Sequence, residues 1–120
     1  MSFKRKNFGK FGEDTAVSFL KKKGYKIIER NFRTRFGEID IVCRKGDKII
    51  FVEVRAKSGA GYGRPEESIN LRKKQKLAAM AAIYLQTKKL HHCNFGIDGV
   101  FVDANGKQAA IRYLENIVEL

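Results

Sequence analysis

The feature that most constrains the fold is a pair of apolar segments, 38–44 and 48–56, on either side of a Gly46-Asp47 dipeptide. A Gly-Asp pair between two such segments is typical of a two-residue β-hairpin turn. With this turn, Lys45 pairs with Lys48, and the register of the whole hairpin follows. The second segment is apolar on both faces, which is typical of a central strand covered on both sides. We therefore expect a sheet that carries packed layers.

This register brings acidic side chains together. Asp40 falls opposite Glu53, and Glu38 falls opposite Arg55. Since side chains alternate along a strand, one face is expected to carry Glu38, Asp40, Val42, Ile49, Phe51, Glu53 and Arg55, and the other Ile39, Ile41, Cys43, Ile50, Val52 and Val54. Directly opposed side chains have Cβ atoms ~4.5–5.5 Å apart, and two like charges at that distance destabilise the sheet.

Carboxylates inside a covered strand point to a metal site. Such a group costs several kcal/mol unless it is paired or binds a cation, and an oxygen ligand set without Cys or His favours Mg²⁺ or Mn²⁺. Glu13 is a third candidate, because helical spacing places it on the same stripe as Ala16, Val17 and Leu20. Three acids and the Arg55 guanidinium could then meet on one patch.

Ordinary structural roles for these acids remain open. An acid such as Glu13 in a first helical turn is favoured by the helix dipole alone. The simple ion pairs available to the others are Glu38 with Arg55 and Asp40 with Arg33 or Arg35.

The remaining sequence predicts the order α-β-β-β-α-β-β. The expected elements are a helix over about 12–23 ended by Gly24, a strand over 25–33, the hairpin, a glycine-rich loop over 58–65, a helix over about 70–87 with Asn70 or Ser68 as N-cap, and strands over 97–102 and 109–113. This order predicts one mixed α/β domain over residues 1–120, with two main helices on a central sheet of about five strands.

The charge indicates a polyanionic partner. Lys and Arg number 25 against 13 Asp and Glu, a net charge of +12. Nucleic acid is the first expectation and an anionic membrane surface the second, while solubility alone is the alternative. The longest apolar run, 77–85, is too short for a membrane span. The basic N-terminus lacks the apolar stretch of a secretory signal, so we expect a cytoplasmic protein with two free thiols.

Several segments resemble the YraN-like family, an uncharacterised group with a restriction-endonuclease-like fold. They are Gly12-Glu13-x-x-Ala16, Asn31-Phe32-Arg33, Gly37-Glu38-Ile39-Asp40, Phe51-Val52-Glu53-Val54-Arg55-x-Lys57, Tyr62-Gly63 and the helix Lys73–Leu85. The D…E-x-K arrangement is also similar to the signature of the PD-(D/E)xK nucleases, and archaeal Holliday-junction resolvases look similar. The resemblance implies a restriction-endonuclease-like fold and metal-dependent hydrolysis of phosphodiester bonds in DNA, branched or single-stranded.

The resemblance also assigns roles within the site. Asp40 and Glu53 would bind one or two Mg²⁺ (or Mn²⁺) ions, the backbone carbonyl of Val54 would be a further ligand, and Glu13 would complete the site. Residue 55 would steer the nucleophile and steady the transition state.

Residue 55 departs from the family pattern, which has lysine there and arginine two residues later. This chain has Arg55 and then Lys57. Arginine stays protonated and cannot act as a general base, although it can clamp a phosphate through two hydrogen bonds. Lys57, on the same strand face, is the candidate for the missing amine. The alternative is a catalytically impaired nucleic-acid-binding module with the same fold.

The candidate nucleic-acid-binding residues are Arg33, Arg35, Arg64, Lys73 and Lys76, with Lys4, Arg5, Lys6, Lys10, Arg72 and Lys74 as further basic groups. Lys73 extends the apolar stripe of the second helix by one turn and could point toward the acids, or it could belong to a solvated helix start. Phe3, Phe8 and Phe11 could stack on unpaired bases or cap the core.

Two further interpretations follow from the sequence. His91-His92-Cys93 has no second Cys/His pair spaced for zinc, so we interpret it as a loop. A resolvase-like enzyme would have to form a homodimer to cut symmetric strands.

Overall fold

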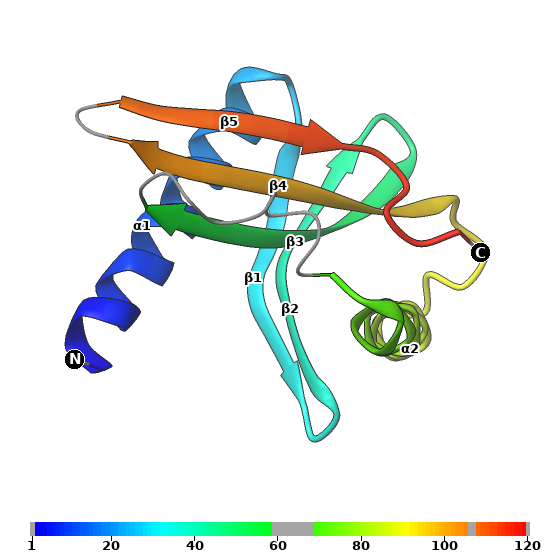
Figure 1. Cartoon of the computed structure of the whole chain (residues 1–120). Helices are drawn as coiled ribbons and strands as arrows, with labels where there is room; N and C mark the ends of the chain where they lie inside the picture. Colours follow the sequence, from blue (N-terminus) through cyan, green and yellow to red (C-terminus); the bar gives the residue numbers. More distant parts are fainter. Residues whose placement is uncertain (1, 59–68, 106–107, 120) are drawn as a thin grey trace.

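A five-stranded sheet with the spatial order β1-β2-β3-β4-β5 forms the centre of the molecule (Figure 1). The structure is a computed structural model that describes residues 2–58, 69–105 and 108–119. The strands are β1 (Lys26–Thr34), β2 (Gly37–Lys45), β3 (Lys48–Ser58), β4 (Phe95–Asn105) and β5 (Gln108–Leu114). Only the β3–β4 neighbours run parallel among these strands, and the other pairs are antiparallel. The predicted element order and the mixed α/β class are confirmed.

Helix α1 (Ser2–Lys22) begins earlier than the predicted residue 12 and ends where the sequence indicates. The Tyr25 amide donates to the Leu20 carbonyl at 3.0 Å, and the Gly24 amide donates to the Lys21 carbonyl at 3.0 Å. Gly24 has φ +90°, so it is the left-handed residue of a Schellman C-cap. The residues before Gly12 show no apolar residues at regular helical spacing, so the sequence did not predict this part of the helix.

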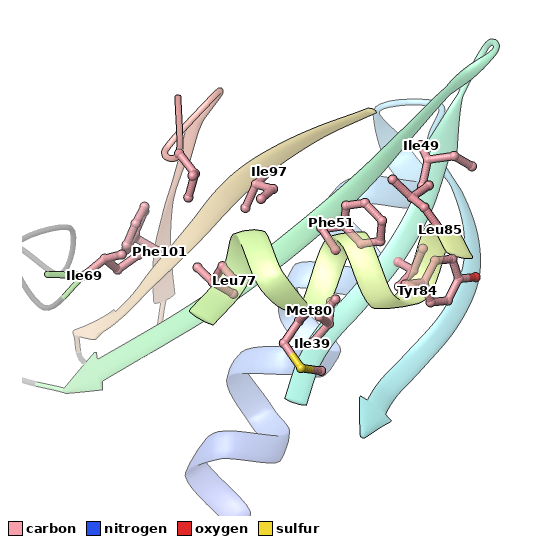
Figure 2. Packing of buried hydrophobic residues seen from close by; sticks show 13 residues of the cluster. Ile39, Ile49, Phe51, Ile69, Leu77, Met80, Tyr84, Leu85, Ile97 and Phe101 are labelled. Atoms are coloured by element: carbon pink, nitrogen blue, oxygen red, sulfur yellow. The ribbon is translucent and has the colours of Figure 1, made fainter. Parts of the chain in front are cut away.

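Helix α2 (Leu71–Thr87) connects the parallel strands β3 and β4, which cannot be joined by a tight turn. Asn70 is the N-cap, because its side chain accepts a hydrogen bond from the Lys73 amide at 2.9 Å. One face of the helix is buried against the sheet through Leu77, Met80, Ala81, Tyr84 and Leu85 (Figure 2). Ser68, the other candidate N-cap, lies outside the described residues.

The two helices cover opposite faces of the sheet, so the molecule has two hydrophobic clusters. Ala16, Val17 and Leu20 of α1 pack on the face that carries Ile41, Cys43, Ile50 and Val52. The α2 residues pack with Val42, Ile49, Phe51 and Ile97 on the other face. The expectation of a central β3, covered on both sides, is confirmed.

One predicted side-chain direction is wrong. Ile39 packs in the α2-side cluster with Val42, whereas Ile41 and Cys43 pack on the α1 side. Two residues three positions apart share a face only if the alternation of the strand is interrupted between them, so β2 is irregular at Asp40. Opposite Asp40 on β1, Asn31 has φ +56°, so the alternation is interrupted on both strands at this level. Beyond it, Phe32, the ladder partner of Ile39, packs edge-on against Tyr84 of α2 with ring centroids 4.9 Å apart.

None of the helices in the described residues is both long enough and apolar enough to cross a membrane. Both cysteines are free thiols.

Candidate functional site

The predicted hairpin register is confirmed from the turn as far as the pair Ile41 and Val52, and Lys45 pairs with Lys48. At the next step the Asp40 side chain replaces the regular ladder, because its Oδ2 accepts a hydrogen bond from the Val54 amide at 2.8 Å. Asp40 is half-buried, and Glu53 is only 3% exposed. The two carboxyl groups lie within hydrogen-bonding reach of each other. The sequence therefore predicted their proximity correctly.

The environment of Asp40 favours its protonated form. Burial and the negative charge of Glu53 raise the pKa of Asp40 from 3.8 to about 7, while the Val54 amide and the Lys73 charge act in the opposite direction. Desolvation disfavours an ionised carboxyl group, and a neighbouring carboxylate disfavours it further. Ionisation of Asp40 beside Glu53 is thus unfavourable.

Two cations contact the buried member of the pair. Arg55 Nη2 lies 3.1 Å and Lys73 Nζ lies 3.2 Å from the same oxygen, Oε2 of Glu53. Arg55 comes from the same strand face, two residues along β3, and Lys73 comes from the first turn of α2. The prediction that Lys73 points toward the acids is confirmed. The alternative, that Lys73 belongs to a solvated helix start, is wrong. The Arg55 Nε atom is buried and has no hydrogen-bond partner among the described residues.

Glu13 lies beside this pair but does not join it. Its Oε1 accepts hydrogen bonds from Arg30 Nε and Asn31 Nδ2, each at 3.0 Å. Asn31 stands level with Asp40, between the ladder pairs Arg30–Ile41 and Phe32–Ile39. The described part of the chain contains no group of three or more His, Cys, Asp or Glu side chains placed to hold a metal ion. Of the three acids expected to meet, only Asp40 and Glu53 lie together. Glu13 is separate because its helix, α1, covers the face opposite to α2.

The alternative ion pairs of the sequence analysis are replaced by others. Glu38 is the ladder partner of Arg33 on β1, and Arg33 Nε lies 3.4 Å from Glu38 Oε2. The predicted pairing of Glu38 with Arg55 is wrong, because the β2–β3 ladder stops before it reaches them. Arg33 thus pairs with Glu38, and Arg35 stacks on Phe36. Neither of them is the partner of Asp40.

The other predicted residues lie in different places. Val54 is half-buried, with its amide facing Asp40, and Lys57 follows Arg55 by two residues on β3. Arg33 and Arg35 are exposed near the β1–β2 turn, and Lys76 is exposed on α2. Arg64 lies outside the described residues, as do the side chains of Phe3 and Phe8. His91, His92 and Cys93 form the expected loop after α2.

Sequence reasoning missed a second buried carboxylate, Asp98 on β4. It is 3% exposed and accepts hydrogen bonds from the Tyr113 hydroxyl and, at 2.9 Å, from the Asn116 amide. Burial and the charge of Asp98 raise the pKa of the Cys43 thiol to about 12. The signal was present, because Asp98 interrupts an apolar strand as Glu53 does. Its partners hold the chain after β5 against the sheet, which indicates a structural role.

The match to known proteins covers most of the chain. Residues 12–102 match the uncharacterised protein family UPF0102. The chain belongs to this family. A UPF0102 protein of Dehalococcoides mccartyi is 43% identical over 97% of this chain and 96% of its own length. One from Syntrophus aciditrophicus is 39% identical over 93% and 88%, and one from Persephonella marina is 54% identical over 64% and 66%. The expected family is confirmed at this level, and all of the site residues described above are inside the matched range.

Proposed function

We propose that this UPF0102 protein is a metal-dependent nuclease that hydrolyses phosphodiester bonds in branched or single-stranded DNA in the cytoplasm, as a member of the restriction-endonuclease-like superfamily. The observation that carries the proposal is the buried pair of Asp40 and Glu53, flanked by Arg55 and Lys73. Two neighbouring buried carboxylates are unfavourable in a fold unless cations accompany them. Arg55 and Lys73 contact Glu53, and a divalent ion would neutralise Asp40 as well.

The residues fit a hard divalent cation such as Mg²⁺ or Mn²⁺. Among the described residues, the Val54 amide contacts Oδ2 of Asp40, and Arg55 and Lys73 contact Oε2 of Glu53. Carboxylate oxygens are the ligands that such ions prefer, and Mg²⁺ is commonly held by one or two carboxylates together with substrate oxygens. Asp40, Glu53 and the Val54 carbonyl would hold the ion, and Glu13 would support the site through Asn31.

The bound ion would lower the pKa of the attacking water and neutralise charge on the phosphate. The protein's own cations supply the rest. Arg55 has a buried Nε without a partner in the described residues, and a phosphate oxygen would satisfy this donor. Lys73 presents an amine 3.2 Å from Glu53 Oε2, so it can orient a water or a phosphate oxygen beside the pair. Lys73 and Lys57 are thus the two candidates to supply the amine that is missing at residue 55.

The first turn of α2 also favours a phosphate ligand. It contains Arg72, Lys73 and Lys74 and no acidic residue. Cations at a helix N-terminus are unfavourable for the helix itself, because that end of the dipole is already positive. A polyanionic substrate would compensate for this arrangement.

One observation favours the alternative, a nucleic-acid-binding module without turnover. Arg55 and Lys73 both occupy Glu53 Oε2 and so already neutralise the acid that a metal would need. In such a module the acids would hold the two cations in place for binding phosphates.

A cleavage assay separates the two functions. Forked, four-way-junction and single-stranded DNA are incubated with the protein in Mg²⁺, Mn²⁺ or EDTA, and the wild type is compared with Asp40→Asn. Metal-dependent cleavage that disappears in the variant supports the nuclease. Salt-sensitive binding without cleavage supports the module, and the absence of binding and cleavage contradicts both.

The Arg55→Lys variant should cleave faster than the wild type if residue 55 limits the reaction. Size-exclusion chromatography with DNA tests the homodimer that symmetric cleavage requires.

A further inference from the structure

The turn between β1 and β2 carries an exposed aromatic ring, Phe36, at a position where the ring is not needed for the hydrophobic core. Thr34 pairs with Gly37, so Arg35 and Phe36 are the two turn residues. Such turns normally use Gly, Asn, Asp, Pro or Ser. Phe36 is 52% exposed. Its ring is covered on one side by the Arg35 guanidinium, whose Cζ lies 4.9 Å from the ring centroid.

The position of this turn is fixed by the surrounding structure. The Phe36 amide donates a hydrogen bond to Thr34 Oγ1 at 3.0 Å, and the same hydroxyl donates to Met80 Sδ of α2 at 3.1 Å. Gly37 has φ +146°, which other residues adopt only with strain. The tip of the β1–β2 hairpin projects away from the rest of the sheet in Figure 1. The tip thus protrudes and is restrained by hydrogen bonds. A restrained tip loses less conformational entropy when it binds a partner.

The tip is also basic, and it leads directly into β2, the strand that carries Asp40. Arg33 precedes it with 76% of its side chain exposed, and Arg35 is part of it. Phe36 is four residues before Asp40 in the chain. At the strand rise of ~3.4 Å per residue this is roughly 14 Å, the length of about four base-pair steps of a B-form duplex.

We propose that this tip binds an unpaired base: Phe36, backed by the Arg35 guanidinium, stacks on the base, and Arg33 and Arg35 contact the adjacent phosphates. The inference rests on the proposed function, and it narrows the substrate to DNA with an unpaired base a few nucleotides from the scissile phosphate. Aromatic side chains and guanidinium planes are the groups that stack on unpaired bases, and the net charge of +12 favours a polyanion.

The test measures binding separately from cleavage. Labelled DNA of one sequence is prepared as a fully paired duplex, a duplex with one unpaired base and a single strand, and affinities are measured by fluorescence anisotropy in EDTA at fixed salt. Phe36→Ala should weaken binding to the two forms with unpaired bases by roughly fivefold or more, since stacking contributes ~1–3 kcal/mol per base. Its affinity for the paired duplex should stay within about twofold, because phosphate contacts carry that binding.

Two further variants sharpen the test. Ile28→Ala is the matched control, since it removes a similarly exposed apolar side chain from the other end of β1, and it should leave all three affinities unchanged. Phe36→Trp introduces a tryptophan into a chain that has none, and its fluorescence should be quenched by DNA with an unpaired base.

The outcomes keep the two proposals apart. If the wild type binds DNA but Phe36→Ala behaves like Ile28→Ala, or if Phe36→Trp binds without quenching, the stacking inference is wrong and the proposed function is unaffected. If the wild type binds none of the three DNA forms, both fail. A tip that serves a protein partner gives the first of these results.

Discussion

Burial and the nearby negative charge of Glu53 raise the pKa of Asp40, and the positive charge of Lys73 acts in the opposite direction. The result is a carboxyl group with a pKa of about 7. Between its ordinary pKa and about 7, Asp40 keeps a proton in the folded chain that it loses in the unfolded chain. Its contribution to the free energy of unfolding therefore falls as the pH rises through this range.

The effect of divalent cations on stability should follow the same titration. The ion binds the ionised pair and competes with the proton on Asp40. We expect Mn²⁺ or Mg²⁺ to raise Tm more at about pH 8 than at about pH 6, measured by thermal unfolding with EDTA as the reference. An equal rise at both pH values would mean that the ion binds elsewhere.

Asp40→Asn should remove this dependence. The asparagine Oδ1 can still accept the hydrogen bond from the Val54 amide, and it cannot ionise. Without metal at about pH 8 the variant should be more stable than the wild type by roughly 1–3 kcal/mol, and the metal-induced rise should be lost. Asp47→Asn in the exposed turn is the control, because it changes the net charge equally and should alter neither result.

Lys73 should contribute to stability through Glu53. Lys73→Met leaves the buried carboxylate with one of its two cations, and we expect a loss of about 1–2 kcal/mol at neutral pH. Lys76→Met removes an exposed lysine from the same helix and should cost less than about 0.5 kcal/mol. Chemical denaturation compares the two variants, and equal costs would contradict the role of Lys73.

At the scale of elements, the contact between α1 and β3 depends on one glycine. A Cβ atom at Gly12 would lie 2.6 Å from the Ala56 Cβ atom, which is closer than two such atoms can approach. Gly9, one turn earlier on the same helix, has open space around it. The helix can therefore pack closely on the strand that carries Glu53 and Arg55 only with glycine at position 12.

The two glycines should respond oppositely to alanine. Gly12→Ala should destabilise the protein by about 1–3 kcal/mol because it overpacks the interface. Gly9→Ala should stabilise it by up to about 1 kcal/mol because alanine favours the helix. Urea unfolding measures both. A compensating double variant, Gly12→Ala with Ala56→Gly, should recover part of the loss, and no recovery would contradict the proposed contact.

At the scale of the whole molecule, the excess positive charge and the acidic pair are parts of one arrangement. The net charge is +12, yet the site itself contains two acids, so long-range attraction of a polyanion and local binding of a cation are compatible.

Binding of DNA should therefore depend strongly on salt. Even two phosphate contacts predict that a fourfold rise in salt weakens duplex binding about tenfold. Lys76→Gln should lower the slope of log K against log salt by about one, if Lys76 contacts a phosphate. Arg33→Gln should lower it less, because Glu38 already offsets part of that charge. Affinity that is independent of salt would contradict an electrostatic interface.

The sequence by itself determined what depends on local patterns. The Gly46-Asp47 turn and the hairpin register that follows from it sufficed to bring Asp40 and Glu53 together, and Gly24 and Asn70 marked a helix end and a helix start. Helical periodicity also placed Lys73 on the buried side of α2. These features follow from backbone geometry over a few residues, which is why they could be predicted.

The tertiary structure alone decided which of the candidates meet. It placed α1 and α2 on opposite faces, so Glu13 is held by Arg30 and Asn31 instead of joining the pair. It packed Phe32 and Ile39 of the β1–β2 hairpin against α2, so Ile39 lies on the face opposite to the predicted one. Sheet curvature and the choice of face arise from packing between segments distant in sequence, and a local pattern contains no information about such contacts.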